Sequence, residues 1–354
     1  MSSYSRIHIF RFIAQLLHPT AIPDTFYFPA PQIFWDRLVQ LGSSHLVLPA
    51  IYRALSRKKL IDHTPQDLLL YLQEITDLNQ KRNTAILKQI DFLSELFNIN
   101  QIDYVFIKGA AMLITKSYDA INERMIGDID ILVSEMDLVK AQQLLIDKGF
   151  KPVSNEFSFT NGVFHENQYR HLKRITHPDY IAAVEIHRRL LKRKNLIPAK
   201  DVLRNKVKSI YGHWVSSRQH LWQHAILNWQ YNDNGIARND LAFRTVVDVL
   251  YLEPKEGMPK LKTAPKAIKY FYSLLSLYFS NYKTYYLTKK LVYKYKLQSG
   301  FFDSIHSFFR SFFEFISFSF FHVLLFLSSA IFRKKILNNQ KTFWKRILNF
   351  WNKY

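Results

Sequence analysis

RMIGDIDILVSE, residues 124–135, combines the pattern of a buried β-strand with two carboxylates on one face. Ile129 and Ile131 alternate as the apolar residues of a strand do. Asp128 and Asp130 take the other face, where a strand that is covered on both sides usually carries apolar residues. Residues two apart on a strand lie about 7 Å from each other, so two such carboxylates can hold divalent cations between them. The alternative at this point is a strand at an exposed sheet edge.

The segments on either side of this strand add groups that suit phosphate chemistry. Residues 104–107 (YVFI) predict a short strand that ends in Lys108 and Gly109, just before a helix. Backbone N–H groups at a helix N-terminus favour phosphate oxygens, glycine lets a ligand approach the backbone, and Lys108 adds a positive charge. Arg124 can contact a triphosphate. A third acid, Glu185, stands in a second apolar run, AAVEIH.

The order of the expected elements indicates an α+β core between helical regions. Residues 32–100 have helical periodicity, with Gly42 as a stop signal and Thr64 before Pro65 as the start of a long helix. The chain then alternates between strands and helices, one helix ending at Gly149, and two later runs can pair as a hairpin across a Pro-Asp turn. The expected parts are a helical region over 1–100, a core over 101–200, a second helical region over 201–300 and a Phe-rich basic tail over 301–354.

Three motifs, IKGAAML, RMIGDIDILV and VEIHRRL, together resemble the uncharacterised nucleotidyltransferase family of the polymerase-β-like superfamily. The likeness runs from about residue 34 to residue 254 and includes HLWQHAILNW and FRTVVDVLYL. It implies a small mixed sheet with helices, flanked by N-terminal and C-terminal helical regions. It also implies that a nucleoside monophosphate moves from a nucleoside triphosphate, with ATP expected, to an acceptor hydroxyl. Mg²⁺ or Mn²⁺ would assist, and pyrophosphate would be released.

The resemblance assigns roles by position. Asp128 and Asp130 would bind the metal ions, and Glu185 would be the third carboxylate, which also helps to activate the acceptor hydroxyl. Lys108 and Gly109 would form the phosphate-binding turn. Two positions depart from the usual pattern: the turn reads Lys-Gly-Ala, which lacks the serine of the wider superfamily, and the third acid is Glu where Asp is more usual.

Other polar residues have more than one interpretation. His187 follows Glu185 by two and can share its face, so it is a candidate site residue. Arg244 and Asp248 are four apart on an expected helix, where they pair with each other or Arg244 contacts phosphate. The remaining histidines lack metal-ligand spacing, and we expect packing, hydrogen-bonding or surface roles for them; they include His165, His171, His177, His220 and His224.

Charge is distributed unevenly along the chain. The formal net charge is +21; residues 1–150 carry 15 Lys/Arg and 16 Asp/Glu, and residues 151–354 carry 34 and 12. Such asymmetry suggests an anionic partner, which could be a nucleotide, a nucleic acid or an acidic membrane surface, or else simply solvated lysines. The sequence contains no recognised nucleic-acid-binding motif that would support a nucleic acid as the partner.

The C-terminal tail has the composition of a membrane-associated segment. Residues 315–332 contain no charged residue, and Arg333 and two lysines follow. Apolar residues with a basic flank and tryptophans suit a helix that lies in the membrane plane; the alternative is a helix pair packed on the protein. With no cysteine and no secretory signal, we expect a cytoplasmic protein, peripheral at the inner face of the membrane. A non-catalytic, membrane-docked regulatory module is the alternative function.

Overall fold

The computed structural model describes most of the chain in several ranges. They are residues 6–19, 30–153, 170–191, 196–238, 241–253, 264–276 and 278–279, with single positions at 327, 333 and 337. The chain forms two compact units, residues 1–156 with 165–290, and residues 157–164 with 291–354. In the second unit, Arg333 Nη1 donates to the carbonyl oxygen of Leu327 at 2.8 Å. The elements below belong to the first unit, and the four-part division drawn from the sequence stays a prediction.

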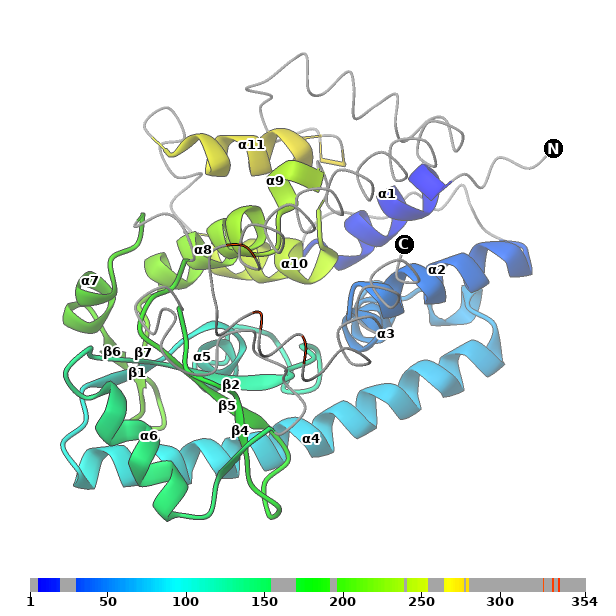
Figure 1. Ribbon diagram of the computed structural model, residues 1–354. Coiled ribbons are helices and arrows are strands. Elements are labelled where there is room, and N and C mark those ends of the chain that lie inside the picture. Colours follow the sequence, from blue (N-terminus) through cyan, green and yellow to red (C-terminus); the bar gives the residue numbers. More distant parts are fainter. Residues whose placement is uncertain are drawn as a thin grey trace. The chain divides into compact units, whose positions relative to one another are not determined.

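A mixed β-sheet lies at the centre of the first unit (Figure 1). Its order among the described residues is β3-β4-β5-β2-β1-β7-β6. The central strands are β1 (Tyr104–Phe106), β2 (Asp128–Val133) and β5 (Ala183–His187). β2 runs antiparallel to β1 and parallel to β5. The outer strands are β3 (Lys151–Pro152), β4 (Ile175–Thr176), β6 (Val207–Lys208) and β7 (Trp214–Val215). The expected α+β architecture is confirmed.

Strand β2 is buried as its sequence pattern predicts. Ile129 and Ile131 are both 0 % exposed. Leu132, which follows Asp130 by two residues on the other face, is equally buried. The bounds of β2 match the predicted strand DIDILV. Burying such side chains stabilises the fold by about 1.5–3 kcal/mol each, which fixes the register of β2 and therefore the positions of its two aspartates.

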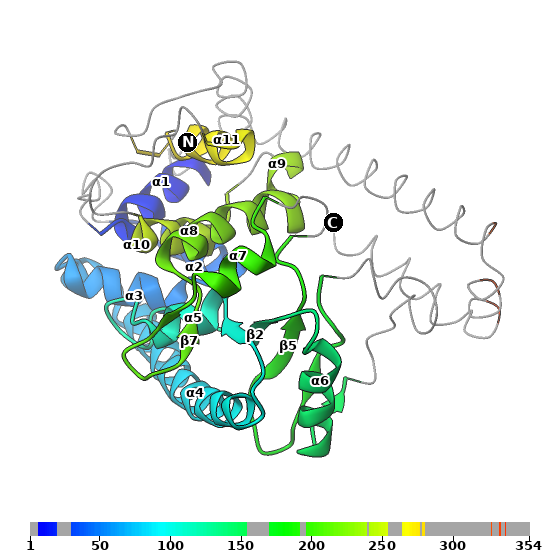
Figure 2. The ribbon, with the colours of Figure 1, turned by 90° about the vertical axis from the view of Figure 1, so that its left-hand side faces the viewer.

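Helices cover the sheet. Short helix α5 (Lys108–Ile114) follows β1 and lies between α4 and the pair α8 and α10 (Figures 1 and 2). Helix α4 (Gln66–Ile99) is fixed to the core partly by Gln89, whose amide nitrogen donates to the carbonyl of Ala182 at 2.8 Å. The remaining helical elements are α1 (Arg6–Leu17), α2 (Gln32–Ser44), α3 (Leu48–Arg57), η2 (Ile61–His63), α6 (Leu138–Asp147), α7 (Ala199–Arg204), α8 (Arg218–Leu227), η4 (Asn228–Asn232), α9 (Gly235–Arg238), α10 (Phe243–Leu252) and α11 (Lys266–Leu275).

Two local signals were misread. Gly42 does not end α2, which continues to Ser44; a Cβ at Gly42 would lie 2.7 Å from Ile51 Cδ1, so this glycine allows close packing between helices. Thr64 does not cap α4, because its hydroxyl donates to the carbonyl of Leu60 at 2.9 Å and Pro65 holds the cap position.

Other expectations are confirmed. Gly149 follows α6 with a φ of 92°, the left-handed conformation expected at a helix C-terminus. The predicted hairpin forms, with Ile175 of β4 paired to Val184 of β5. The Phe-rich tail lies almost wholly outside the described residues. Among the residues that the structure does describe, no helix combines the length and apolar character that a membrane crossing requires.

Candidate metal and nucleotide site

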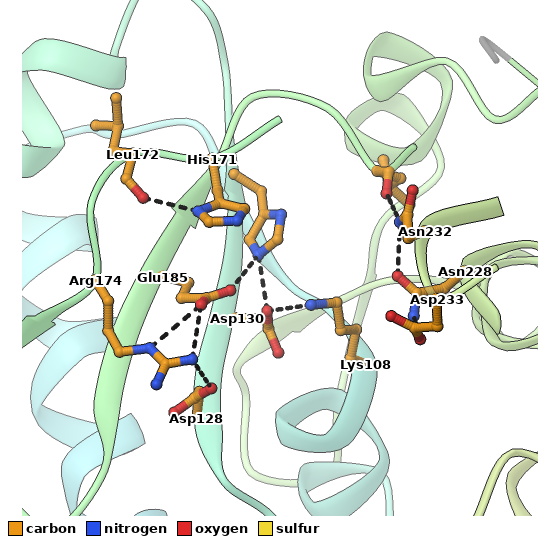
Figure 3. Close-up of polar contacts among 12 residues, drawn as sticks. Lys108, Asp128, Asp130, His171, Leu172, Arg174, Glu185, Asn228, Asn232 and Asp233 are labelled. Atoms are coloured by element: carbon orange, nitrogen blue, oxygen red, sulfur yellow. Dashed lines mark hydrogen bonds and ion pairs between the residues drawn. The ribbon is translucent and has the colours of Figure 1, made fainter. Parts of the chain in front are cut away.

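The parallel pairing of β2 with β5 brings the predicted acidic residues together. In this register Asp130 pairs with Glu185, and Leu132 pairs with His187. Residues paired across a sheet direct their side chains to the same face. The two carboxylates therefore come from segments 55 residues apart and share one face, as Figure 3 shows.

Asp130 is buried and lies between two nitrogen donors. The Lys108 ammonium donates to Asp130 Oδ1, and His187 Nε2 lies 2.7 Å from the same oxygen. Burial by itself would raise the pKa of the Asp130 carboxyl, but the Lys108 charge and the His187 hydrogen bond outweigh burial and lower that pKa well below its usual range. Asp130 is therefore a carboxylate at any physiological pH.

Glu185 completes a cluster with Asp130 and His187. His187 Nε2 lies 3.4 Å from Glu185 Oε2. Each of the three residues offers one ligand atom, and these atoms lie within 4.8 Å of one another, all from buried side chains. Burial opposes the charge of Glu185, but the His187 hydrogen bond prevails and lowers the pKa of Glu185 to about 2. His187, a secondary candidate in the sequence, thus lies at the centre of the cluster.

Asp128 lies at the edge of this cluster. Arg174 Nη2 donates to Asp128 Oδ2 at 2.9 Å and to Glu185 Oε1 at 3.1 Å, so one guanidinium joins two of the acids (Figure 3). Burial raises the pKa of Asp128, and the Arg174 charge only partly offsets this effect. Arg174 was not foreseen from the sequence, because only the pairing of β4 with β5 brings it beside Glu185.

The turn between β1 and α5 has an unusual backbone at its lysine. Lys108 has a φ of 52°, a left-handed conformation that is uncommon for residues other than glycine. Such strain is found at functional sites, where neighbouring contacts hold it; here the Lys108–Asp130 contact does so. Gly109 lies against the Arg124 guanidinium, and a Cβ there would be 3.1 Å from Arg124 Cζ. Glycine is required at this position because of its neighbour.

Arg124 is bound to an acid of α10. Its Nε donates to Asp248 Oδ1 at 2.7 Å and its Nη2 donates to Asp248 Oδ2 at 2.8 Å. The Tyr118 hydroxyl also donates to Asp248 Oδ1. Asp248 therefore pairs with Arg124 and not with Arg244, the partner four residues away that the sequence offered. Arg124 Nη1 is directed at Gly109. The phosphate contact predicted for Arg124 stays a prediction.

The other histidines divide between local hydrogen bonding and packing. Ser217 caps α8, because its Oγ accepts from the backbone N–H of His220. The same Oγ lies 3.0 Å from His220 Nδ1. His224 is buried. His171 forms a bridge to His187, with ring centroids 5.1 Å apart, and His177 packs on Phe150. His165 lies outside the described residues.

The cluster suits a divalent cation by the chemistry of its donors. Two carboxylates provide the hard oxygen ligands that Mg²⁺ and Mn²⁺ prefer, and an imidazole is compatible with Mn²⁺. His187 has a second nitrogen, Nδ1, that is buried and lacks a hydrogen-bond partner within the described part of the chain. Asp130, Glu185 and His187 would hold the cation, and Asp128, which pairs with Arg174, lies beside them.

Comparison with known proteins agrees with this geometry. The model of a family described as "Uncharacterised nucleotidyltransferase" matches residues 31–250, which include the whole sheet and the site. No curated protein matches the chain. Residues 31–250 are more than half of the sequence, and the family is one of transferases. The chain therefore belongs to the uncharacterised nucleotidyltransferase family.

Proposed function

We propose that this protein is a Mg²⁺- or Mn²⁺-dependent nucleotidyltransferase that uses a nucleoside triphosphate, with ATP expected. The observation that carries the proposal is the buried cluster of Asp130, Glu185 and His187, whose ligand atoms lie within 4.8 Å of one another. Two ionised carboxylates held this close repel each other, which costs free energy unless a positive charge lies between them. A cation relieves that repulsion and binds phosphate oxygens at the same place.

In this proposal the chain's own residues position the reactants. Lys108 belongs to the turn between β1 and α5, and its ammonium group reaches the carboxylates. There it would bind a phosphate oxygen as a point charge. Asp130, Glu185 and His187 would bind the metal, with Asp128 as a further carboxylate beside them, and the metal would supply Lewis-acid activation of the phosphate. The pKa of Glu185, about 2, makes it a weak proton acceptor. We therefore assign Glu185 to ligation and to orienting the acceptor hydroxyl, not to storing its proton.

The reaction would be an in-line displacement at the α-phosphorus. The acceptor oxygen forms a bond to phosphorus as the bond to the β-phosphate oxygen breaks, and the electron pair leaves with pyrophosphate. The acceptor proton passes to solvent. Positioning and charge neutralisation supply most of the rate in such reactions.

Transfer of label from nucleotide to acceptor tests the proposal. The full chain is incubated with α-³²P-labelled nucleoside triphosphates, Mg²⁺ or Mn²⁺ and a cell lysate. Acceptor labelling is expected, and Asp130→Asn should abolish it while the thermal melt stays cooperative. No labelling with any nucleotide, and no saturable nucleotide binding by calorimetry, would refute the proposal.

A non-catalytic binding module is the second candidate. It is favoured by one observation: the charged side chains of Lys108 and Arg174 already pair with all three acids. Such pairing can neutralise the cluster without metal. A Mn²⁺ titration by calorimetry separates the candidates, because a module of this kind should have no saturable site.

A further inference from the structure

A cavity of about 240 Å³ adjoins the carboxylate cluster. Its lining comes from α5, α8 and α10 and from the segment that follows α8. Lys108 lines this cavity and also donates to Asp130, so the cavity and the cluster share one side chain. Figure 3 shows Lys108 between the carboxylates on one side and Asn228 and Asp233 on the other. We call this space the α10 cavity.

The α10 cavity contains a half-buried cation that forms no ion pair with an acid of the described residues, and the charges of Asp248 and Asp233 only partly offset its burial. Arg244 lines it, and neither a hydrogen bond nor an ion pair joins Arg244 to any residue that the structure describes. Asp248, one turn further along α10, already binds Arg124 and Tyr118. Asp233 is exposed and accepts from Asn228 Nδ2 at 2.9 Å. Desolvation of an unpaired guanidinium is costly, and burial followed by the Arg124 charge lowers the pKa of Arg244.

A second unpartnered group lines the same cavity. His224 is 2 % exposed, and its Nε2 has no hydrogen-bond partner among the residues that the structure describes. Buried polar atoms are almost always hydrogen-bonded in folded proteins, so this nitrogen is open to a ligand or a water in the cavity. Burial, together with the charge of Lys108, lowers the pKa of His224 to about 3. The imidazole is therefore neutral at pH 7, and Nε2 can donate a hydrogen bond in one tautomer.

We propose that the α10 cavity binds the two distal phosphates of the nucleotide, which leave as pyrophosphate. Arg244 would bind their oxygens with two donors, and His224 would add a third donor. This inference rests on the proposed function, since it takes the α-phosphate to be at the Asp130–Glu185 cluster. Lys108 then bridges the α-phosphate and the leaving group.

The charge of the cavity selects this half of the nucleotide. The base and sugar are uncharged and would leave Arg244 without a counter-ion, whereas the β- and γ-phosphates carry most of the charge of the molecule. When the bond between the α-phosphorus and the bridging oxygen breaks, the electron pair and the new negative charge go to pyrophosphate. A guanidinium already in place stabilises that charge without reorganising.

Binding measurements with small phosphates test the inference directly. Pyrophosphate, a nucleoside triphosphate and the matching monophosphate are titrated into the full chain by calorimetry, in EDTA so that no metal contributes. Arg244→Gln should weaken pyrophosphate and triphosphate by about 10-fold or more, the usual effect of losing charged hydrogen bonds. The monophosphate affinity should change by less than about 2-fold. Arg244→Lys, which keeps the charge, should give an intermediate loss.

The matched control is Arg204→Gln. Arg204 is an exposed arginine of α7 that lines no part of the α10 cavity, so it reports non-specific attraction of anions. Melting curves verify that each variant is folded. Unchanged pyrophosphate affinity in Arg244→Gln overturns the inference, and so does an equal loss for the monophosphate. In the first case an anionic acceptor is the better occupant.

The outcomes also separate this inference from the proposed function. Arg244-dependent pyrophosphate binding in a chain that labels no acceptor supports the phosphate site and refutes the transferase activity. Acceptor labelling by the wild-type chain, with pyrophosphate affinity indifferent to Arg244, refutes the inference and leaves the activity standing.

Discussion

The ion pair between Arg124 and Asp248 joins the segment just before β2, the strand that carries the aspartates, to helix α10. The two hydrogen bonds measure 2.7 and 2.8 Å, and the side chains are 12 % and 9 % exposed. Replacing Asp248 by Asn would leave the Arg124 guanidinium buried without a counter-ion. Breaking one partner of a buried pair costs about 3–5 kcal/mol. For a chain of 354 residues, the unfolding entropy is about 0.74 kcal/mol/K, so the melting temperature should fall by about 4–7 °C.

Urea unfolding followed by circular dichroism measures this cost. Tyr118→Phe is the control, because it removes only the hydroxyl contact with Asp248 and should cost about 1 kcal/mol. The double variant Arg124→Met with Asp248→Leu removes both charges and should recover much of the loss, since apolar replacement of a buried pair is often nearly neutral. A cost below about 1 kcal/mol for Asp248→Asn, or a double variant as unstable as the single one, would refute the reasoning.

Four further outcomes follow from the site and the tail. His224 has a folded pKa of about 3 against 6.5 for the free side chain, so the unfolded chain binds the proton first. The unfolding free energy should therefore decrease as pH falls from 6.5 towards 3, by at most about 1.4 kcal/mol per pH unit, and His224→Asn should flatten this dependence in urea titrations. Asp130→Asn should abolish saturable Mn²⁺ binding by calorimetry, because it removes one of the two carboxylates of the buried cluster. Gly109→Ala should destabilise the fold by about 1–3 kcal/mol through collision with Arg124, measured by urea unfolding. Deletion of residues 301–354 should move the chain from anionic vesicles to the supernatant in a flotation assay.

Matched variants make these outcomes decisive. Gly127→Ala is the control for Gly109, because a Cβ at Gly127 meets no atom within 4 Å. Asp147→Asn, an exposed acid at the end of α6, controls for Asp130. A pH dependence unchanged by His224→Asn would contradict its assignment as a buried neutral group. A full chain that does not float with vesicles would end the membrane prediction.

The sequence indicated the elements whose patterns are local. Alternation in DIDILV predicted β2 with its correct bounds, because a two-residue period states which face is buried. The position of Lys108 and Gly109 after β1 was equally readable, since strand, turn and helix follow one another directly. Helix starts and stops were less accurate: Gly42 and Thr64 carry the right residue types, but tertiary packing uses them for another purpose.

Only the tertiary structure decided which groups meet. Asp130 and Glu185 are recognisable as acids in the sequence, but their pairing depends on the register of two strands far apart in the chain. Arg174 meets Glu185 only because β4 and β5 form a hairpin. Asp248 meets Arg124 across 124 residues of sequence. Periodicity records whether a residue is buried, and it contains no information about what lies opposite. The sequence by itself therefore determined the strand, its acids and the family. The fold alone decided which cations neutralise those acids, and it places no acid of the described residues in an ion pair with Arg244.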